Sequence, residues 1–112
     1  MAQIIWTEPA LQDLDEIAEY IALDKVSVAK RLIKKIFARV ELLEKQPQSG
    51  RNPPELSGLR YKEVIVNPCR IFCRFTDNTI FILYVMRSER NLKNYILKER
   101  ESEHNKTREN KK

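Results

Sequence analysis

The first quarter of the chain carries two successive patterns of hydrophobic residues. Residues 3–6 are apolar and β-branched, which is typical of a short strand. Thr7 is then placed to cap a helix, and Pro9 falls in its opening turn. The apolar residues that follow recur at helical spacing, at Leu11, Leu14, Ile17, Ala18 and Ile21. The pattern predicts a strand followed by an amphipathic helix, with Trp6 anchoring the junction in the core.

A second and longer helix is predicted after a short connection, with Ser27 as its N-cap. Its apolar stripe consists of Ala29, Leu32, Ile33, Ile36, Phe37, Val40 and Leu43. The opposite face carries five cations, Lys30, Arg31, Lys34, Lys35 and Arg39. Like charges at this spacing repel one another unless they are solvated or opposed by acids. Pro47 and Gly50 are expected to end the helix.

The second half of the chain contains three β-rich runs, at 61–66, 70–75 and 79–86. The pairs Asn67-Pro68 and Asp77-Asn78 separate them, and both pairs favour turns. A loop rich in proline, glycine and polar residues, 46–58, leads into the first run. The order βααβββ predicts an α+β fold, with an N-terminal strand and a helical hairpin packed on an antiparallel twisted sheet.

Length and composition indicate one domain. The chain has 112 residues, of which 42% are hydrophobic and 33% charged, as in ordinary globular proteins. We expect a folded domain over residues 1–97 and a charged tail, frayed or disordered, over 98–112, because that segment has almost nothing apolar to bury. No basic leader and no run of about 20 apolar residues is present, so a cytoplasmic protein is expected.

Charge is distributed unevenly along the chain. Residues 1–24 contain six acids and no Lys or Arg, whereas the remainder holds all 21 basic residues and 10 of the 16 acids. One end should therefore repel nucleic acid while the rest attracts it.

Two cysteines, Cys69 and Cys73, share one face of a predicted strand. With no further cysteine and a single histidine, His104, the chain lacks the usual ligands of a structural zinc site. We expect buried free thiols, with redox chemistry as the alternative, and neither a metal nor a cofactor.

Basic residues gather on or beside the predicted meander. Alternation places Arg70, Phe72 and Arg74 on one face of their strand, and Cys69, Ile71, Cys73 and Phe75 on the other, towards the core. A basic sheet face follows from this alternation. The candidate target-binding residues are Arg60, Lys62, Arg70, Arg74, Arg87 and Arg90. The alternative interpretation is that these are solvated charges or ion pairs with Glu55, Glu63 and Glu89.

Four sequence blocks carry a family resemblance. They are I-I-W-T-x-P-A-x-x-D-L-x-x-I-x-x-Y-I-A (4–22), P-x-x-G-R (47–51), E-L-x-x-L-R (55–60) and R-I-F-x-R-F (70–75). Together they resemble the ParE branch of the RelE/ParE toxins, which includes plasmid stabilisation toxins, over residues 3–92. The resemblance implies the toxin of a type II toxin–antitoxin system, bound in a hetero-oligomer by a cognate antitoxin. Exposed apolar positions bordered by Lys and Arg would suit an antitoxin helix or added strand that folds on binding.

The target differs between the branches of this family. The resemblance to ParE implies inhibition of DNA gyrase by binding, whereas RelE-like members cleave ribosome-bound mRNA. If the chain were such an endoribonuclease, Arg70 and Arg90 would match the family's catalytic arginines. Tyr95 lies roughly where that branch has a tyrosine, although a half-buried terminal tyrosine is the commoner situation, and His104 is poorly placed for a general base.

Departures from the family pattern favour binding over acid–base chemistry. Cys69 and Cys73 stand in a strand where many relatives have tyrosines, and Arg87 replaces the histidine of the block V-x-H-x-x-R. The predicted function is therefore a gyrase-binding toxin with no confident catalytic residue. An mRNA endonuclease is one alternative. A non-toxic remnant that still binds the antitoxin is another.

Overall fold

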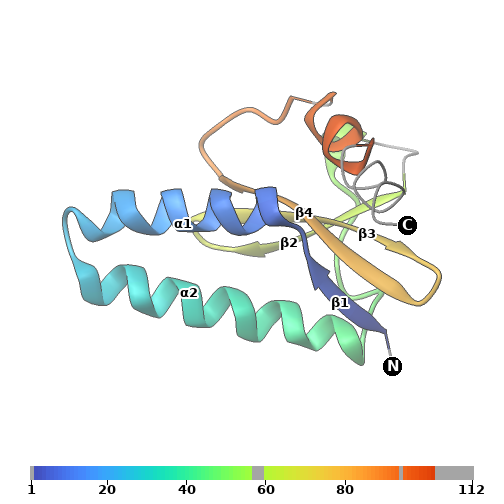
Figure 1. Cartoon of the computed structure of the whole chain (residues 1–112), viewed down its shortest axis with the longest axis horizontal. Coiled ribbons are helices and arrows are strands. Elements are labelled where there is room, and N and C mark those ends of the chain that lie inside the picture. The colour runs from blue at the N-terminus through green and yellow to red at the C-terminus, as the bar shows by residue number, and fades with distance from the viewer. Residues whose placement is uncertain (1, 57–59, 94, 103–112) are drawn as a thin grey trace.

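The α+β architecture is confirmed in the computed structural model, which describes residues 2–56, 60–93 and 95–102 (Figure 1). Its main elements are β1 (Gln3–Trp6), α1 (Glu8–Ala22), α2 (Val26–Glu41), β2 (Tyr61–Val66), β3 (Cys69–Thr76) and β4 (Thr79–Arg87). Two 3₁₀ turns, Leu42–Glu44 and Pro54–Leu56, lie between α2 and β2. Residues 95–102 are helical. No helix in these ranges is long and apolar enough to span a membrane.

The four strands form one mixed sheet in the order β1-β4-β3-β2. The meander β2-β3-β4 is antiparallel, as predicted, whereas β1 pairs in parallel with β4 from Gln3↔Thr79 to Trp6↔Ile82. The predicted turn at Asp77 and Asn78 is present, with φ angles of 49° and 59°. Two consecutive positive φ values match the twist of a hairpin, and Asp and Asn tolerate them better than most residues.

Neither of the two predicted N-cap residues caps its helix with its side chain. Thr7 does hold the N-cap position of α1, but its side chain caps no helical N–H. Instead its Oγ1 donates a hydrogen bond to the carbonyl oxygen of Ile82 at 2.6 Å. Thr7 therefore ties the start of α1 to β4. Ser27 lies inside α2, whose N-cap is Lys25, because the helix begins earlier than the cap signal indicated.

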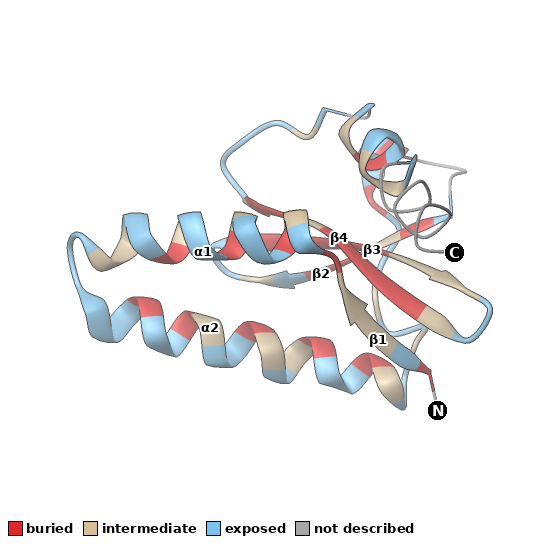
Figure 2. Ribbon diagram, viewed as in Figure 1, coloured by how far each residue is buried: buried red, intermediate tan, exposed pale blue. Residues whose placement is uncertain are grey.

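One hydrophobic core fills the space between the helices and the sheet. Cys69, Ile71 and Cys73 of β3 face it, as the alternation predicted. The helices contribute buried residues at helical spacing, Ala10, Leu14, Leu32, Ile36 and Val40 (Figure 2). Trp6 packs against Phe37 of α2 with ring centroids 4.9 Å apart, and so joins β1 to the helical hairpin.

A second core covers the opposite face of the sheet, where a basic, solvent-facing surface was predicted. That prediction is wrong: Phe72 is completely buried there, together with Leu83 and Leu97. Phe72 pairs with Tyr84 while Cys73 pairs with Ile82, so Leu83 is an extra residue that bulges β4. The bulge turns both Leu83 and Tyr84 towards the second core.

The chain after residue 97 contributes to this second core region. Residues 98–102 continue a helix, although we predicted a frayed tail from Lys98 onwards. Arg100 forms an ion pair with Asp13 of α1, and Glu101 forms one with Arg74 of β3. These charged side chains hold the helix through ion pairs, a contribution that the count of apolar residues did not include. Residues 103–112, with His104, lie outside the described residues.

Candidate binding site between α1 and β4

Arg70, the first of the predicted site residues, is held inside an ion-pair network. Its Nε donates to Glu63 Oε2 at 2.7 Å, and its Nη1 and Nη2 donate to the two carboxylate oxygens of Glu55, each at 2.8 Å. Glu63 is fully buried and also accepts from Arg51 Nε at 2.5 Å. The hydrogen bonds to Arg70 lower the pKa of Glu55 to about 2, and both carboxylates raise the pKa of Arg70.

The network has a structural consequence. Arg51 and Glu63 also bridge through their backbones, and a Cβ at Gly50 would come within 3.0 Å of the Glu63 carbonyl oxygen. The loop before β2 is thus packed directly against that strand. The guanidinium of Arg70 fastens this loop to β3, and its Cζ atom lies 4.9 Å from the centre of the Phe72 ring. For Arg70 the structure therefore matches the alternative interpretation, in which it forms ion pairs with Glu55 and Glu63.

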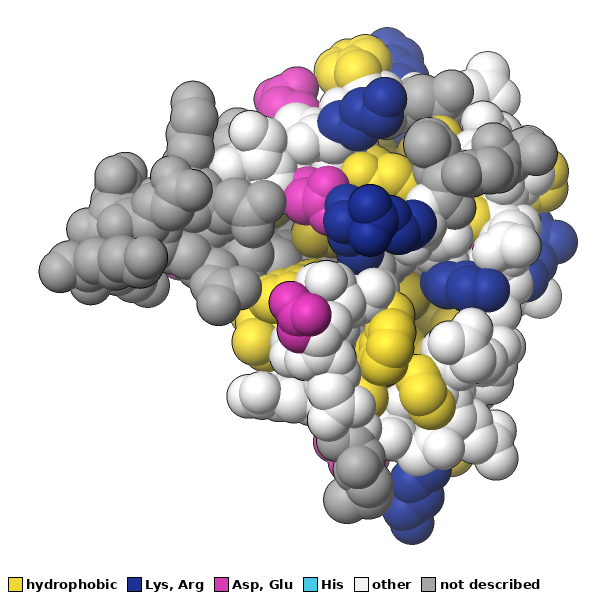
Figure 3. All heavy atoms as spheres, turned by 90° about the vertical axis from the view of Figure 1, so that its right-hand side faces the viewer, with side chains coloured by type: hydrophobic (Ala, Val, Ile, Leu, Met, Phe, Trp, Pro, Cys, Tyr) yellow, Lys and Arg dark blue, Asp and Glu magenta, His cyan; other side chains and the backbone are white. Residues whose placement is uncertain are grey.

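The other predicted residues do not form one basic face. Arg74 pairs with Glu101, and Arg60 is exposed just before β2. Lys62 is the register partner of Cys73 and so lies on the helix side of the sheet, opposite Arg70. On the end of the molecule far from the α1–α2 connection, Lys and Arg side chains are separated by hydrophobic and acidic ones (Figure 3).

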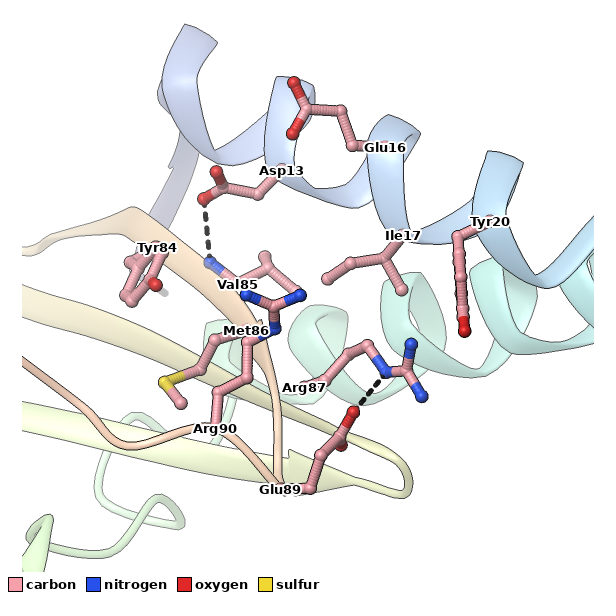
Figure 4. A pocket seen from close by; sticks show the side chains of 10 residues that line it. All are labelled: Asp13, Glu16, Ile17, Tyr20, Tyr84, Val85, Met86, Arg87, Glu89 and Arg90. Carbon is pink, nitrogen blue, oxygen red and sulfur yellow. Dashed lines mark hydrogen bonds and ion pairs between the residues drawn. The ribbon is translucent and has the colours of Figure 1, made fainter.

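Arg87 and Arg90 are the two predicted residues that the structure brings together. Both line a groove of about 560 Å³ between α1 and the C-terminal half of β4 (Figure 4). Arg87 lies over the ring of Tyr20 at 4.7 Å, and its Nε lies 2.7 Å from Glu89 Oε1. That contact is an ion pair and not a hydrogen bond, because no acceptor satisfies the Nε–H group. Arg90 is exposed on the turn after β4.

The groove combines an apolar interior with a charged rim. Ile17, Val85 and Met86 supply apolar side chains. Acidic residues of α1 line one side and the arginines of the β4 end line the other, so that Asp13 and Glu16 stand across from Arg87 and Arg90 (Figure 4). Tyr20, at the open end, has 60% of its surface exposed. A surface of this kind can bury apolar side chains of a partner and pair with charges of either sign.

The wall of the groove is an uncovered strand edge. Because β1 ends opposite Ile82, the remainder of β4 has no neighbouring strand on that side within the described residues. Side chains satisfy two of its backbone groups: the N–H of Val85 donates to Asp13 Oδ2 at 3.1 Å, and the carbonyl oxygen of Leu83 accepts from Arg100 Nη1 at 3.1 Å. Charged groups on an edge strand protect it from unwanted pairing.

Asp13 connects the groove to the C-terminal helix. Besides the bond from Val85, it accepts from Arg100 Nη2 at 3.0 Å. Arg100 also lies 4.6 Å from the centre of the Tyr84 ring. Burial, followed by the charge of Asp13, raises the pKa of the Tyr84 hydroxyl, which is therefore protonated at neutral pH. The phenol can donate a hydrogen bond and is a poor base.

The thiols offer no nucleophile near the groove. Cys69 and Cys73 are buried and free, as expected. Burial raises the pKa of Cys69 to about 11 and that of Cys73 to about 12, so both are protonated at neutral pH. Within the described ranges, no group of three or more His, Cys, Asp or Glu residues could hold a metal ion.

The α1 side of the groove was not predicted from the sequence. The helical spacing places Asp13 and Glu16 on a face turned towards water, and nothing local shows that Asp13 accepts a hydrogen bond from a strand residue 72 positions away. A weak signal was present in Asp13, which lies beside the apolar stripe of the helix and not opposite it.

Comparisons with known proteins agree on one family. The model of the ParE toxin of the type II toxin–antitoxin system parDE matches residues 4–92. A structure titled as the chromosomal ParDE toxin–antitoxin system from P. aeruginosa has a chain that is 27% identical, with a TM-score of 0.66. The alignment covers 80% of this chain and 98% of that one.

A curated relative is protein Y4kP of Sinorhizobium fredii (strain NGR234), whose name marks a provisional assignment as a toxin. It is 43% identical over 49 residues, which are 44% of this chain and 51% of the relative. This chain therefore spans about half the length of that relative.

The βααβββ fold that the chain shares with this P. aeruginosa structure places it in a class of proteins, the small α+β toxins of toxin–antitoxin systems. The family follows from the match over residues 4–92, which is well over half of the chain. The chain belongs to the ParE toxin family of type II toxin–antitoxin systems.

Proposed function

We propose that this protein is a toxin that inhibits DNA gyrase by binding, and that a cognate antitoxin neutralises it by occupying the groove between α1 and β4. Membership of the ParE family is the observation that carries the proposal. The related structure from P. aeruginosa is titled as a ParDE toxin–antitoxin system, which supports an antitoxin partner here.

The groove supports docking of an antitoxin segment. An extended segment can add main-chain hydrogen bonds along the β4 edge, and an amphipathic helix can place its apolar side against Ile17 and Tyr20. Carboxylates of the partner would pair with Arg87 and Arg90, and its cations with Glu16. A segment that adds to the edge must replace the contacts that Asp13 and Arg100 make there.

Binding accounts for the arginines better than RNA cleavage does. An endonuclease would require Arg70 and Arg90 to contact the same reacting phosphate. Arg70 is engaged by Glu55 and Glu63, and its side chain is only 10% exposed. A phosphate would have to displace two carboxylates from it, whereas Arg90 lies exposed at the groove.

The test measures supercoiling and DNA cleavage by purified gyrase with added toxin, beside an mRNA cleavage assay in a translation extract. Inhibited supercoiling or trapped DNA breaks, with intact mRNA, is the expected result. Toxin mixed beforehand with the antitoxin encoded beside it serves as the control and should leave gyrase active. Cut mRNA with unaffected gyrase would contradict the proposal and favour the endonuclease. Antitoxin binding without effect in either assay would identify a non-toxic remnant.

A further inference from the structure

The outer face of α2 is strongly basic. Lys30, Arg31, Lys34 and Lys35, here named the α2 ridge, are all exposed. They alternate with the buried Leu32 and Ile36 in sequence and point to the opposite side of the helix. In Figure 2 the exposed residues follow the border of α2 that faces away from the sheet. The ridge belongs to α2, whereas the groove is lined by α1, β4 and the turn after β4.

The geometry of α2 concentrates these charges. Lys30 and Lys34, and likewise Arg31 and Lys35, are four residues apart and stand one turn above each other, about 6 Å along the helix axis. Ser27 and Ala38 lie on the same outward face, and both are small and exposed. They leave space at each end of the ridge for a bulky ligand to approach the cations.

The fold does not account for the ridge. None of its four residues forms an ion pair with a carboxylate in the described ranges, whereas six other pairs are formed there. Like charges one turn apart destabilise a helix. Arg39 differs, because it is half-buried and donates to the Ser49 carbonyl oxygen at 3.2 Å. The ridge thus concentrates positive charge that lacks an internal counter-ion among the described residues.

We propose that the α2 ridge binds the phosphate backbone of duplex DNA. Protein interfaces have cores depleted in lysine and enriched in apolar and aromatic residues, whereas the ridge has a single large exposed apolar neighbour between Ser27 and Ala38, Val28, which is 40% exposed. Insertion into a membrane surface would likewise need several apolar side chains beside the cations. A polyanion needs only the cations, because the release of its condensed counter-ions drives binding. The proposal does not depend on gyrase being the target.

The test measures binding of the full chain to a fluorescent 20-base-pair duplex by anisotropy, over a series of salt concentrations. The ridge variant replaces Lys30, Lys34 and Lys35 with glutamine, which keeps helix propensity nearly unchanged. A matched control replaces Lys45, Lys93 and Lys98, three exposed lysines elsewhere, with glutamine. The two variants have the same net charge, so a difference between them reports position.

We expect the ridge variant to bind at least about tenfold more weakly at 0.1 M salt, and its plot of log K against log salt to flatten by about 2 to 3. The control variant should stay within about twofold of the wild type. Circular dichroism of both variants excludes loss of fold. Equal weakening in the two variants would overturn the proposal, as would wild-type chain that binds anionic vesicles and not the duplex.

Discussion

Two regions of this protein contain arginines beside carboxylates, and they differ in what those charges are free to do. Around Arg70, the carboxylate oxygens of Glu55 and Glu63 each accept from a guanidinium, and Glu63 is fully buried. In the groove, Arg90 and Glu16 are exposed on opposite walls. The first region holds a loop on the sheet, and the second presents charge to a partner.

The comparison indicates that a basic residue can contribute to a binding surface only if carboxylates of the same chain do not occupy its hydrogen-bond donors in the fold. Arg70 and Arg90 both matched family arginines, yet the first has satisfied its donors within the fold. Mutations should separate the two regions, because changes around Arg70 act on stability and changes in the groove act on binding.

The largest effect is expected from Glu63→Ala. This change leaves Arg70 and Arg51 without their shared carboxylate, and Arg70 is buried, so the free energy of unfolding should fall by about 3 to 5 kcal/mol. Urea denaturation measures it. Glu89→Ala, which removes an exposed carboxylate at the groove, is the comparison and should cost less than about 1 kcal/mol. Similar losses in the two variants would contradict the distinction between the regions.

Asp13→Ala should have the next largest effect on stability, a loss of about 1 to 3 kcal/mol. The N–H of Val85 and the partly buried guanidinium of Arg100 would each lose the hydrogen bonds that they donate to Asp13. Asp15→Ala is a suitable control, since Asp15 is exposed on the same helix. Hydrogen exchange at the Val85 amide should accelerate in the first variant and remain unchanged in the second.

A smaller effect is expected from pH. The folded-state pKa of Glu55 is about 2, below its ordinary value of 4.5, so its pairing with Arg70 stabilises the fold fully above about pH 4.5. That stability is lost as the pH falls towards 2. Since the Glu55 side chain is 36% exposed, solvent screening reduces the contribution to about 1 kcal/mol. Urea denaturation of wild type and Glu55→Gln should differ at pH 6 and converge near pH 2; a constant difference would refute the pairing.

The smallest effect on stability is expected from Arg90→Ala. Arg90 is exposed, and its truncation should change the free energy of unfolding by no more than about 0.5 kcal/mol. Toxicity or antitoxin affinity should nevertheless fall. Arg70→Ala is the contrasting variant, because its main effect should be a lower free energy of unfolding. An Arg90→Ala protein with full toxicity and unaltered antitoxin affinity would remove Arg90 from the binding surface.

The sequence predicted the elements well because their signals are local. Helical spacing placed α1 and α2, and the pair Asp77-Asn78 located the β3–β4 turn. The environment of β3 was not predictable in the same way. Arg70 and Arg74 on either side of Phe72 indicate a solvent face by alternation, but Glu55, Glu63 and Glu101 neutralise them from other parts of the chain. Phe72 then becomes buried.

The groove was missed for a related reason. Its two walls come from α1 and from the end of β4, which are far apart in sequence. The open edge exists because β1 is only four residues long and pairs in parallel with β4, so that it stops at Ile82. Neither the parallel pairing nor the bulge at Leu83 has a local sequence signal that identifies it.

The most direct test of the groove as the antitoxin-binding site is titration calorimetry with the cognate antitoxin, comparing Tyr20→Ala with Tyr95→Ala. The two tyrosines are equally exposed, at 60% and 61%, but only Tyr20 lines the groove. Tyr20→Ala should weaken binding by about 30-fold, as truncation of an aromatic anchor does. Tyr95→Ala should bind within about twofold of the wild type. Equal affinity of the Tyr20 variant and the wild type would contradict docking in the groove.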